Sequence, residues 1–319
     1  TSTIDVTSLD DKRYYMVLTD IIASGTVGIR HRLGNSSIDT GSNYARRDSF
    51  DGASDGTGAS LTSTATTGGI SIDDQVLGVH YVSNLSAKEK LLTGHYNLSN
   101  ATGAATAPNR GETVGKWANT SAVIDDVEQL TGDPGFGTGS EVVVLGWDPA
   151  DTHTTNFWEE LASVDLSGGA SDTLDSGTFT AKKYLWVQGF VEDNGAAIRP
   201  TFRFNSVSTG TPYAARRSVN GAADATNATV NQMYLSDSNS NYVAPTFFNM
   251  FIINNSANEK LCIYHDVSRD TAGAATVPDR NESVGKWAYT SGQITSIQAF
   301  NDQAGDFSTN SVMKVWGSD

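Results

Sequence analysis

The sequence repeats itself at a spacing of 170 residues, and this repeat constrains the fold more than any other feature of the chain. Residues 102–121 read TGAATAPNRGETVGKWANTS, and residues 272–291 read AGAATVPDRNESVGKWAYTS. The two stretches align without a gap. Self-similarity over a whole domain length predicts two copies of one fold in tandem, each of about 150 to 165 residues.

The match extends in both directions and sets the domain limits. Upstream, residues 87–91 (AKEKL) align with residues 257–261 (ANEKL), and residues 12–14 (KRY) align with residues 182–184 (KKY). Downstream, both copies close on an apolar run that is followed by Gly-x-Asp. We therefore predict a first domain at residues 1–149, a short polar linker at residues 150–156 and a second domain at residues 157–319.

The second copy begins with a strand-like segment at residues 157–166, FWEELASVDL. Its counterpart in the first copy would fall before Thr1, so the first copy is expected to lack this opening strand. Two explanations stay open. Either the chain is a section of a longer array of such units, or a neighbouring subunit donates the strand, as in strand-addition assemblies.

Short apolar runs separated by turn residues predict an all-β chain. The runs are rich in β-branched and aromatic residues, and turn pairs such as Asp51-Gly52 and Asn220-Gly221 lie between them. No window carries the apolar stripe of a long helix. We predict two antiparallel β-sandwiches of the jelly-roll type, with residues 36–69 and 220–240 as surface loops that leave room for an extra hairpin. The expected strands include residues 14–18, 76–82, 141–145, 184–190, 201–205, 246–253, 260–264 and 312–316.

The charge of the chain argues against several partners. The formal net charge is −15, and the 21 Lys and Arg residues form no long runs. Binding to nucleic acid or to an anionic membrane requires a basic surface, so neither partner is expected. No apolar stretch is long enough to span a membrane. The single cysteine, Cys262, rules out an intrachain disulfide and is expected to be buried and inert.

Polar residues that recur in both copies are candidates for a functional site. An Arg and a Glu lie two residues apart beside the VGKWA motif, and residues at this spacing share a face of a strand. A His recurs upstream of them. This group would either bind a ligand or form a structural ion pair, and we favour the ion pair because repetition suits a fold determinant. The residues are His95, Arg110 and Glu112 in the first copy and His265, Arg280 and Glu282 in the second.

Two further kinds of site are weighed. Trp117 and Trp287 would stack on a sugar ring if they were exposed, but strand residues in the best-matched motif are expected to pack in the core. Asp51, Asp55 and Asp224 lie in loops whose oxygens would suit calcium, although no EF-hand pattern is present. Neither a metal-binding spacing nor a nucleophile motif in a fitting context is found. We predict a non-enzymatic protein without a cofactor, with calcium as the weak alternative.

The motif series of the second copy is similar to a known class of proteins. It runs from WEELASVDL at 158–166 through KKYLWV at 182–187, FRFN at 202–205 and YAAR at 213–216 to a closing stretch at 285–317 that begins GKWAYTS. This series resembles repeat units in virion structural proteins of marine tailed viruses. The resemblance implies jelly-roll or lectin-like sandwiches on capsids, tails or fibres, and it assigns no catalytic residue.

The favoured function is a structural protein of a virion, as a capsid decoration, tail or fibre subunit. It would act through multivalent contacts with copies of itself, as a homo-oligomer, and with other particle proteins. The alternative is an extracellular filament or layer protein of a cell surface, or a carbohydrate-binding adhesin with glycans as partners. An exposed aromatic platform on one sheet would favour glycan binding, whereas buried Trp117 and Trp287 with paired edges would favour assembly.

Overall fold

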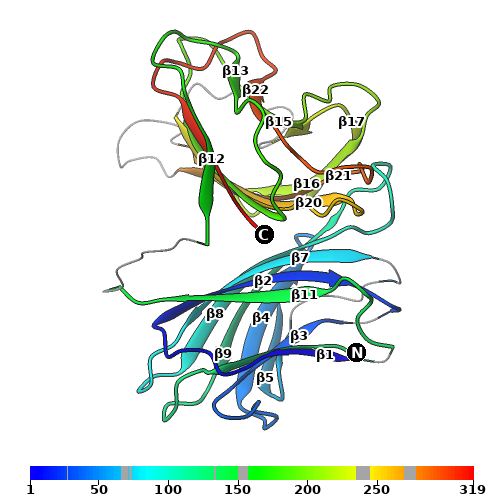
Figure 1. Cartoon of the computed structure of the whole chain (residues 1–319), viewed down its shortest axis with the longest axis vertical. Helices are drawn as coiled ribbons and strands as arrows, with labels where there is room; N and C mark the ends of the chain where they lie inside the picture. Colours follow the sequence, from blue (N-terminus) through cyan, green and yellow to red (C-terminus); the bar gives the residue numbers. More distant parts are fainter. Residues whose placement is uncertain are drawn as a thin grey trace. The chain divides into compact units, whose positions relative to one another are not determined.

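The computed structural model describes residues 1–26, 28–65, 71, 74–132, 134–149, 157–234, 245–268 and 278–319. These residues form β-strands, turns and loops, and none of them belongs to a helix that could cross a membrane. The chain divides into two compact units (Figure 1): unit 1 comprises Thr1–Asn100 and Asn109–Thr154, and unit 2 comprises Ala101–Pro108 and Thr155–Asp319. The predicted linker at residues 150–156 lies outside the described residues.

Unit 1 is a sandwich of two antiparallel sheets. The larger sheet has seven strands in the order β11-β2-β7-β8-β9-β4-β5, and the smaller has four in the order β1-β10-β3-β6. In Figure 1, β2, β7 and β11 lie in one layer and β1 and β3 in the other. The strands are β1 (Thr3–Val6), β2 (Tyr14–Ile22), β3 (Arg30–Gly34), β4 (Tyr44–Phe50), β5 (Gly56–Leu61), β6 (Thr64–Ala65), β7 (Gln75–Ser83), β8 (Lys90–Leu98), β9 (Asn109–Trp117), β10 (Asp126–Leu130) and β11 (Glu141–Trp147).

Unit 2 has the same two-layer arrangement with one strand more. Its larger sheet has eight strands in the order β12-β23-β14-β19-β20-β21-β16-β17, and its smaller sheet has four in the order β13-β22-β15-β18. The strands are β12 (Glu159–Asp165), β13 (Thr173–Asp175), β14 (Tyr184–Val191), β15 (Pro200–Phe204), β16 (Tyr213–Val219), β17 (Ala225–Val230), β18 (Met233–Tyr234), β19 (Thr246–Ile253), β20 (Lys260–Ser268), β21 (Asp279–Trp287), β22 (Ile297–Asn301) and β23 (Val312–Ser318).

The two sandwiches repeat the same strand pairings. Tyr44 lies opposite Trp117 across β4 and β9, and Tyr213 lies opposite Trp287 across β16 and β21. The added strand is β12, which pairs with β23 at the edge of the larger sheet. Among the described residues, no strand pairs with the outer edge of β11, the counterpart of β23. The predicted fold class of two tandem antiparallel jelly-roll-like sandwiches is confirmed.

The two stretches predicted as surface loops contain hairpin strands in their described part, so the extra hairpin for which the prediction left room is present in each unit. The hairpin β4–β5 turns at Asp51 and Gly52, with φ of 49° and 74°, and the hairpin β16–β17 turns at Asn220 and Gly221, with φ of 52° and 73°. Positive φ at both central residues is the geometry of a tight hairpin turn, which Asp, Asn and Gly adopt most easily. The polar composition concealed β5 and β17 because these two strands end the larger sheets and most of their side chains are exposed or half-buried.

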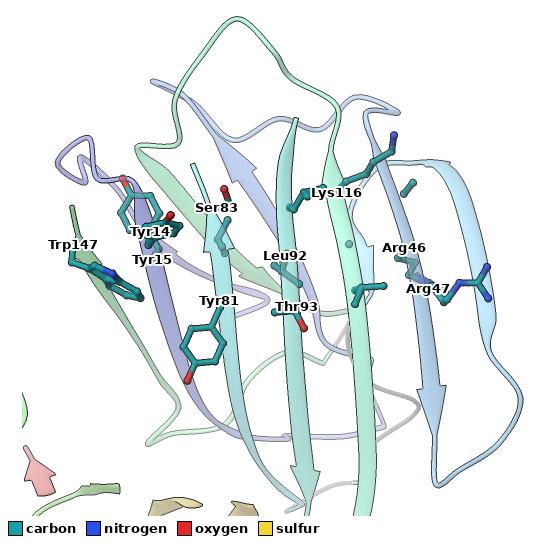
Figure 2. A pocket seen from close by; sticks show the side chains of 15 residues that line it. Tyr14, Tyr15, Arg46, Arg47, Tyr81, Ser83, Leu92, Thr93, Lys116 and Trp147 are labelled. Atoms are coloured by element: carbon teal, nitrogen blue, oxygen red, sulfur yellow. The ribbon is translucent and has the colours of Figure 1, made fainter. Parts of the chain in front are cut away.

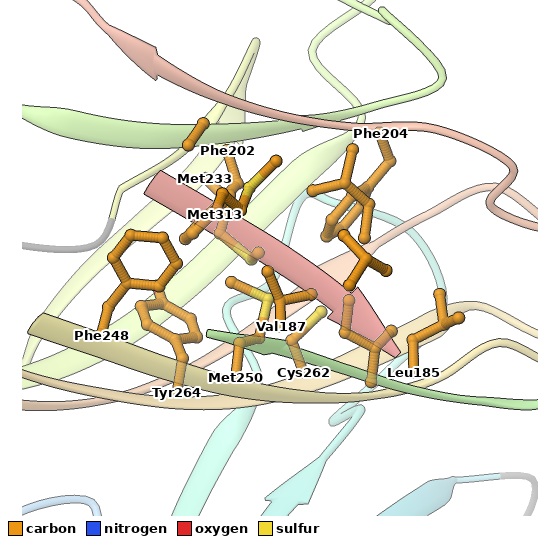
Figure 3. Packing of buried hydrophobic residues seen from close by; sticks show 14 of the residues in the cluster. Leu185, Val187, Phe202, Phe204, Met233, Phe248, Met250, Cys262, Tyr264 and Met313 are labelled. Carbon is orange, nitrogen blue, oxygen red and sulfur yellow. The ribbon is translucent and has the colours of Figure 1, made fainter. Parts of the chain in front are cut away.

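The cores of the two units differ although their strands match. Unit 2 packs Phe202 and Met250 into one continuous apolar cluster (Figure 3). At the matching positions unit 1 has His31 and His80, and its apolar core forms two separate clusters. The Nε2 atoms of the two histidines lie 3.3 Å apart, and the Gln129 side chain lies 2.9 Å from Nε2 of His31. Unit 1 therefore buries a polar group where unit 2 buries hydrocarbon.

Burial lowers the pKa of two histidines in the core of unit 1 and raises the pKa of an aspartate in the core of unit 2. Burial lowers the pKa of His31 to about 3, and burial together with the nearby rings of His31 and His95 holds the pKa of His80 well below its usual value. In unit 2, burial raises the pKa of Asp266 to about 8, although the Asn281 amide donates a hydrogen bond to this carboxyl at 2.6 Å. At neutral pH the folded chain therefore keeps His31 and His80 uncharged and Asp266 mostly protonated.

We predict that lowering the pH from 7 to 4.5 destabilises unit 1 and stabilises unit 2. Below pH 6.5 the unfolded chain binds protons at His31 and His80 that folded unit 1 does not bind. Its free energy of unfolding therefore falls by about 1.4 kcal/mol per histidine and pH unit. The carboxyl of Asp266 is protonated only in the folded state between pH 3.8 and about 8, so the stability of unit 2 rises as the pH falls through this window.

Hydrogen exchange with mass spectrometry checks this prediction strand by strand. Amides of β7 should lose protection at pH 4.5 relative to pH 7, after correction for intrinsic exchange rates, while amides of β19 should gain it. Equal losses in both strands would contradict the opposite pKa shifts of the buried histidines and Asp266.

Candidate functional site

A groove crosses the outer face of the larger sheet of unit 1 (Figure 2). Its volume is about 690 Å³, and side chains of β11, β2, β7, β8, β9 and β4 line it. Alternation along the strands produces this lining. Val82 and Leu92 pack in the core between the sheets, so their neighbours Tyr81 and Leu91 point to the opposite face and into the groove.

One end of the groove is aromatic. Tyr14, Tyr81 and Trp147 lie close together there, on β2, β7 and β11 (Figure 2). The ring centroids of Tyr14 and Trp147 are 5.7 Å apart, and Tyr81 is 37% exposed. The guanidinium group of Arg13 lies 5.5 Å from the centre of the Tyr14 ring. These rings form an apolar surface that a partner can cover.

The other end of the groove carries exposed aliphatic side chains beside the basic residues Arg46, Arg47 and Lys116 (Figure 2). Leu91 on β8 is 58% exposed and Val114 on β9 is 51% exposed. Lys116 at this end forms an ion pair of 2.9 Å with Glu89. The described residues that line the groove include neither a carboxylate nor a histidine. The groove therefore presents a largely apolar surface, without the histidine or carboxylate that most often transfers protons in catalysis.

In unit 2 the matching aliphatic surface is covered. Leu261 and Val284 occupy the positions of Leu91 and Val114 in the repeat, and they are 0% and 1% exposed. Part of the cover is the segment Ala101–Pro108, which the sequence places between β8 and β9 but which belongs to unit 2. The same surface is thus exposed in one repeat and buried in the other.

Hydrogen bonds hold this covering segment over β16 and β21. The Nζ atom of Lys286 donates to the carbonyl of Ala101 at 2.5 Å, and Lys286 shares its face of β21 with Val284. The Nε atom of Arg216 donates to the carbonyl of Pro108 at 2.9 Å, and Arg216 lies directly opposite Val284 in the ladder. Contacts on both sides of Val284 therefore place the segment across that residue.

The matching aromatic surface of unit 2 is covered as well. Trp158, just before β12, has its ring centroid 5.7 Å from that of Trp186 and 6.2 Å from that of Phe251. Phe251 occupies the position of Tyr81 in the repeat. The opening segment of the second repeat thus shields an aromatic surface whose counterpart in unit 1 lines the groove.

The structure brings together the polar residues that recur in both copies. In each unit a His lies directly opposite a Glu on the neighbouring strand, and an ion pair joins this Glu to the Arg two residues before it. None of the six residues lines the groove. In unit 1 His95 lies opposite Glu112, which pairs with Arg110; in unit 2 His265 lies opposite Glu282, which pairs with Arg280 at 2.9 Å.

Trp117 and Trp287 lie in the core, as the sequence analysis expected, so they cannot stack on a sugar as the alternative required. Both are 1% exposed. The Nε1 atom of Trp117 donates to Asp39 at 2.7 Å, and the Trp287 ring stacks on Tyr213 with centroids 6.3 Å apart. The ammonium group of buried Lys90 lies 5.7 Å from the centre of the Trp117 ring. The residues of the best-matched motif therefore build the core.

The calcium candidates Asp51, Asp55 and Asp224 have separate local roles. The Asp51 carboxylate accepts a backbone hydrogen bond of 2.7 Å from the start of β9, as expected of a turn residue. Asp55 pairs with Arg47 at 3.0 Å, and the buried carboxylate of Asp224 lies 3.8 Å from Arg216. Nowhere in the described part of the chain do three His, Cys, Asp or Glu residues gather in a way that could hold a metal ion.

Sequence reasoning missed the groove residues Tyr81, Leu91, Val114 and Trp147. Apolar residues occur on both faces of these strands, which is the pattern of strands buried on both sides. Alternation shows which residues share a face but not whether another segment covers that face. Only the comparison of the two folded units reveals which surface is exposed.

Comparisons with known proteins give no family for this chain. No family model matches the sequence, and no curated protein matches it. The LG1-3 region of the laminin alpha2 chain is similar at 9% identity and a TM-score of 0.22, covering 98% of this chain and 63% of that one. Domains LG4-5 of the mouse laminin alpha1 chain are similar at 9% identity and a TM-score of 0.21, covering 99% of this chain and 87% of that one. Likenesses this low identify neither a family nor a function.

We predict that W117A lowers the free energy of unfolding of unit 1 by about 3–5 kcal/mol, because it empties a fully buried indole site. The same truncation at Trp147, at the half-buried end of β11, should cost less than about 2 kcal/mol. Urea unfolding of the two variants measures the difference. Equal costs would show that Trp117 is not a packed core residue.

Proposed function

We propose that this chain is a non-enzymatic structural protein that docks on further units of the same fold through the groove of unit 1. The observation that carries the proposal is the contrast between the two repeats. Leu91 and Val114 are exposed, while Leu261 and Val284 at the same positions are buried in unit 2, which includes the segment Ala101–Pro108. The chain thus contains one example of a covered face and one face without its cover.

The energetics suit an assembly of many copies. Burial of an exposed aliphatic side chain contributes about 1.5–3 kcal/mol, so Leu91 and Val114 supply a weak but specific contact. Weak contacts become strong when many copies act together. The second repeat also carries the letters AGAATVP at residues 272–278, so the sequence that covers unit 2 is present twice in every chain.

The chemistry of the groove supports binding in preference to catalysis. Most of the groove lining is apolar, and its basic side chains Arg46, Arg47 and Lys116 already pair with carboxylates. The similarity to virion repeat units leads us to favour a virus particle as the setting. A cell-surface layer or filament outside the cell is the alternative setting, and the docking chemistry would be the same in both.

Glycan binding is the second candidate function. The neighbouring rings of Tyr14, Tyr81 and Trp147 favour it, because aromatic faces stack on sugar rings. The other end of the groove argues against it, since Leu91 and Val114 offer no hydrogen bonds to hydroxyl groups and the neighbouring Arg46 and Arg47 already pair with Asp48 and Asp55. The two candidates therefore differ in which end of the groove is required.

We predict that L91D combined with V114D weakens self-association of the chain at least tenfold, because it places two charges on the surface that should become buried. Sedimentation velocity over a range of protein concentrations measures the association. The matched control is L85D, which changes a side chain of 38% exposure in the same unit but outside the groove. W147A tests the other end of the groove.

Three outcomes separate the candidates. Loss of association in the double variant, with retention in the control, supports assembly. A wild-type chain that stays monomeric at every concentration overturns it. Retention by a glycan column that is lost in W147A and kept in the double variant would establish glycan binding in its place.

A further inference from the structure

We infer that the outer edge of β11 in unit 1 is a strand-addition site for the opening strand of another repeat. The partner is a strand of the Phe-Trp-Glu-Glu-Leu-Ala-Ser-Val-Asp type, as at residues 157–165. This inference deepens the proposed function and rests on it for the identity of the partner. It uses the edge of the sheet, whereas the proposed function uses its face.

Unit 2 shows how such a strand sits. β12 pairs antiparallel with β23, and its side chains Leu161 and Val164 pack against the core cluster. Below them, Met313 and Val315 of β23 are both 0% exposed. The added strand therefore completes the hydrogen bonding of the edge and closes the core at the same time.

Along β11 of unit 1, no described strand completes the hydrogen bonding of the edge or closes the core. Val142 and Val144 occupy the positions of Met313 and Val315 and pack against the core in the same way, yet both are only half-buried. Inward-facing apolar residues that stay half exposed at an unpaired edge form a template for another strand. Backbone hydrogen bonds would supply the affinity and the side-chain pockets would supply the specificity.

The repeat also sets the register of the added strand. In unit 2, Val164 lies opposite Met313. Transferred to unit 1, the matching valine of the partner lies opposite Val142, and the partner strand runs antiparallel to β11. Trp158 just before β12 would then reach the aromatic end of the groove, because its contact Phe251 corresponds to Tyr81.

Charge differences identify the preferred partner more closely. In unit 2, Glu159 pairs with Lys182 at 3.3 Å and Glu160 pairs with Lys314 at 2.8 Å. Unit 1 keeps a lysine, Lys12, at the position of Lys182, but has Val143 at the position of Lys314. A partner with an apolar residue in place of the second glutamate should therefore fit β11 better than the strand that unit 2 uses.

A synthetic peptide spanning residues 156–167 tests the inference on the full chain. Titration of a dye-labelled peptide, followed by fluorescence anisotropy, should give saturable binding. The peptide variant V164P should bind at least tenfold more weakly, because proline cannot join a ladder and the valine is lost from its pocket. The peptide variant E160V should bind several-fold more tightly, because Val143 replaces the lysine.

Hydrogen exchange on the complex locates the peptide. Protection should increase in β11 and stay unchanged in β23. Equal binding of the native and V164P peptides, or protection at β23 through exchange with β12, would overturn the inference. All variants lie in the peptide, so the folding of the chain is not at risk.

Combined with the sedimentation measurement, the peptide experiment distinguishes failure of the strand site from failure of the proposed function. A chain that binds the peptide at β11 but never self-associates would retain the strand site and lose the assembly role. A chain that self-associates through the groove but does not bind the peptide would retain the assembly role and exclude the strand site.

Discussion

An antiparallel sheet that stops at an unpaired strand leaves backbone donors and acceptors without partners in the sheet, and proteins normally cover or blunt such an edge. In unit 2, β12 covers the edge formed by β23. In unit 1, no described strand pairs with the outer edge of β11, whose inward-facing Val142 and Val144 remain half-buried. We propose that the exposed edge and the groove beside it form a surface of unit 1 that another unit completes.

The two repeats show that one backbone pattern tolerates very different interiors. Tyr44 and Tyr213 hold the same position in each unit and donate and accept the same kind of backbone hydrogen bonds, to Leu33 and Phe204 respectively. Despite this shared backbone geometry, unit 1 buries a pair of histidines where unit 2 buries apolar side chains. A buried neutral histidine is costly in acid, so this difference sets how each unit responds to pH, without changing the strand order.

Much of the fold could be predicted from the sequence because its signals are local and duplicated. The repeat identified two copies of one sandwich, and apolar runs such as 246–253 matched their strand to the residue. Polar strands such as β4 and β5 were not predicted, because they contain too few apolar residues to give a strand pattern. The recurring polar residues could be found by repetition, but the groove could not, because exposure depends on which segment covers a face.

Trp117 and Trp287 show how the two possible roles of a recurring aromatic residue are told apart. An aromatic residue that recurs in both copies of a strongly matched motif can serve either as a binding surface or as part of the core. Repetition alone does not distinguish these two roles, because either role would preserve the residue in both copies. Burial at 1% exposure decides for the core. The residues that can meet a partner are those where the two copies have the same backbone but different surroundings, such as Leu91 and Leu261.

Photo-crosslinking from position 91 tests most directly whether the groove receives another unit of the same fold. A benzophenone amino acid replaces Leu91, the protein is irradiated at a concentration where it associates, and mass spectrometry identifies the joined peptides. If another unit docks in the groove, crosslinks form to a segment of the TGAATAP or AGAATVP type in another copy. Crosslinks confined to the same unit, or to unrelated surface residues scattered over the chain, would contradict docking of this kind.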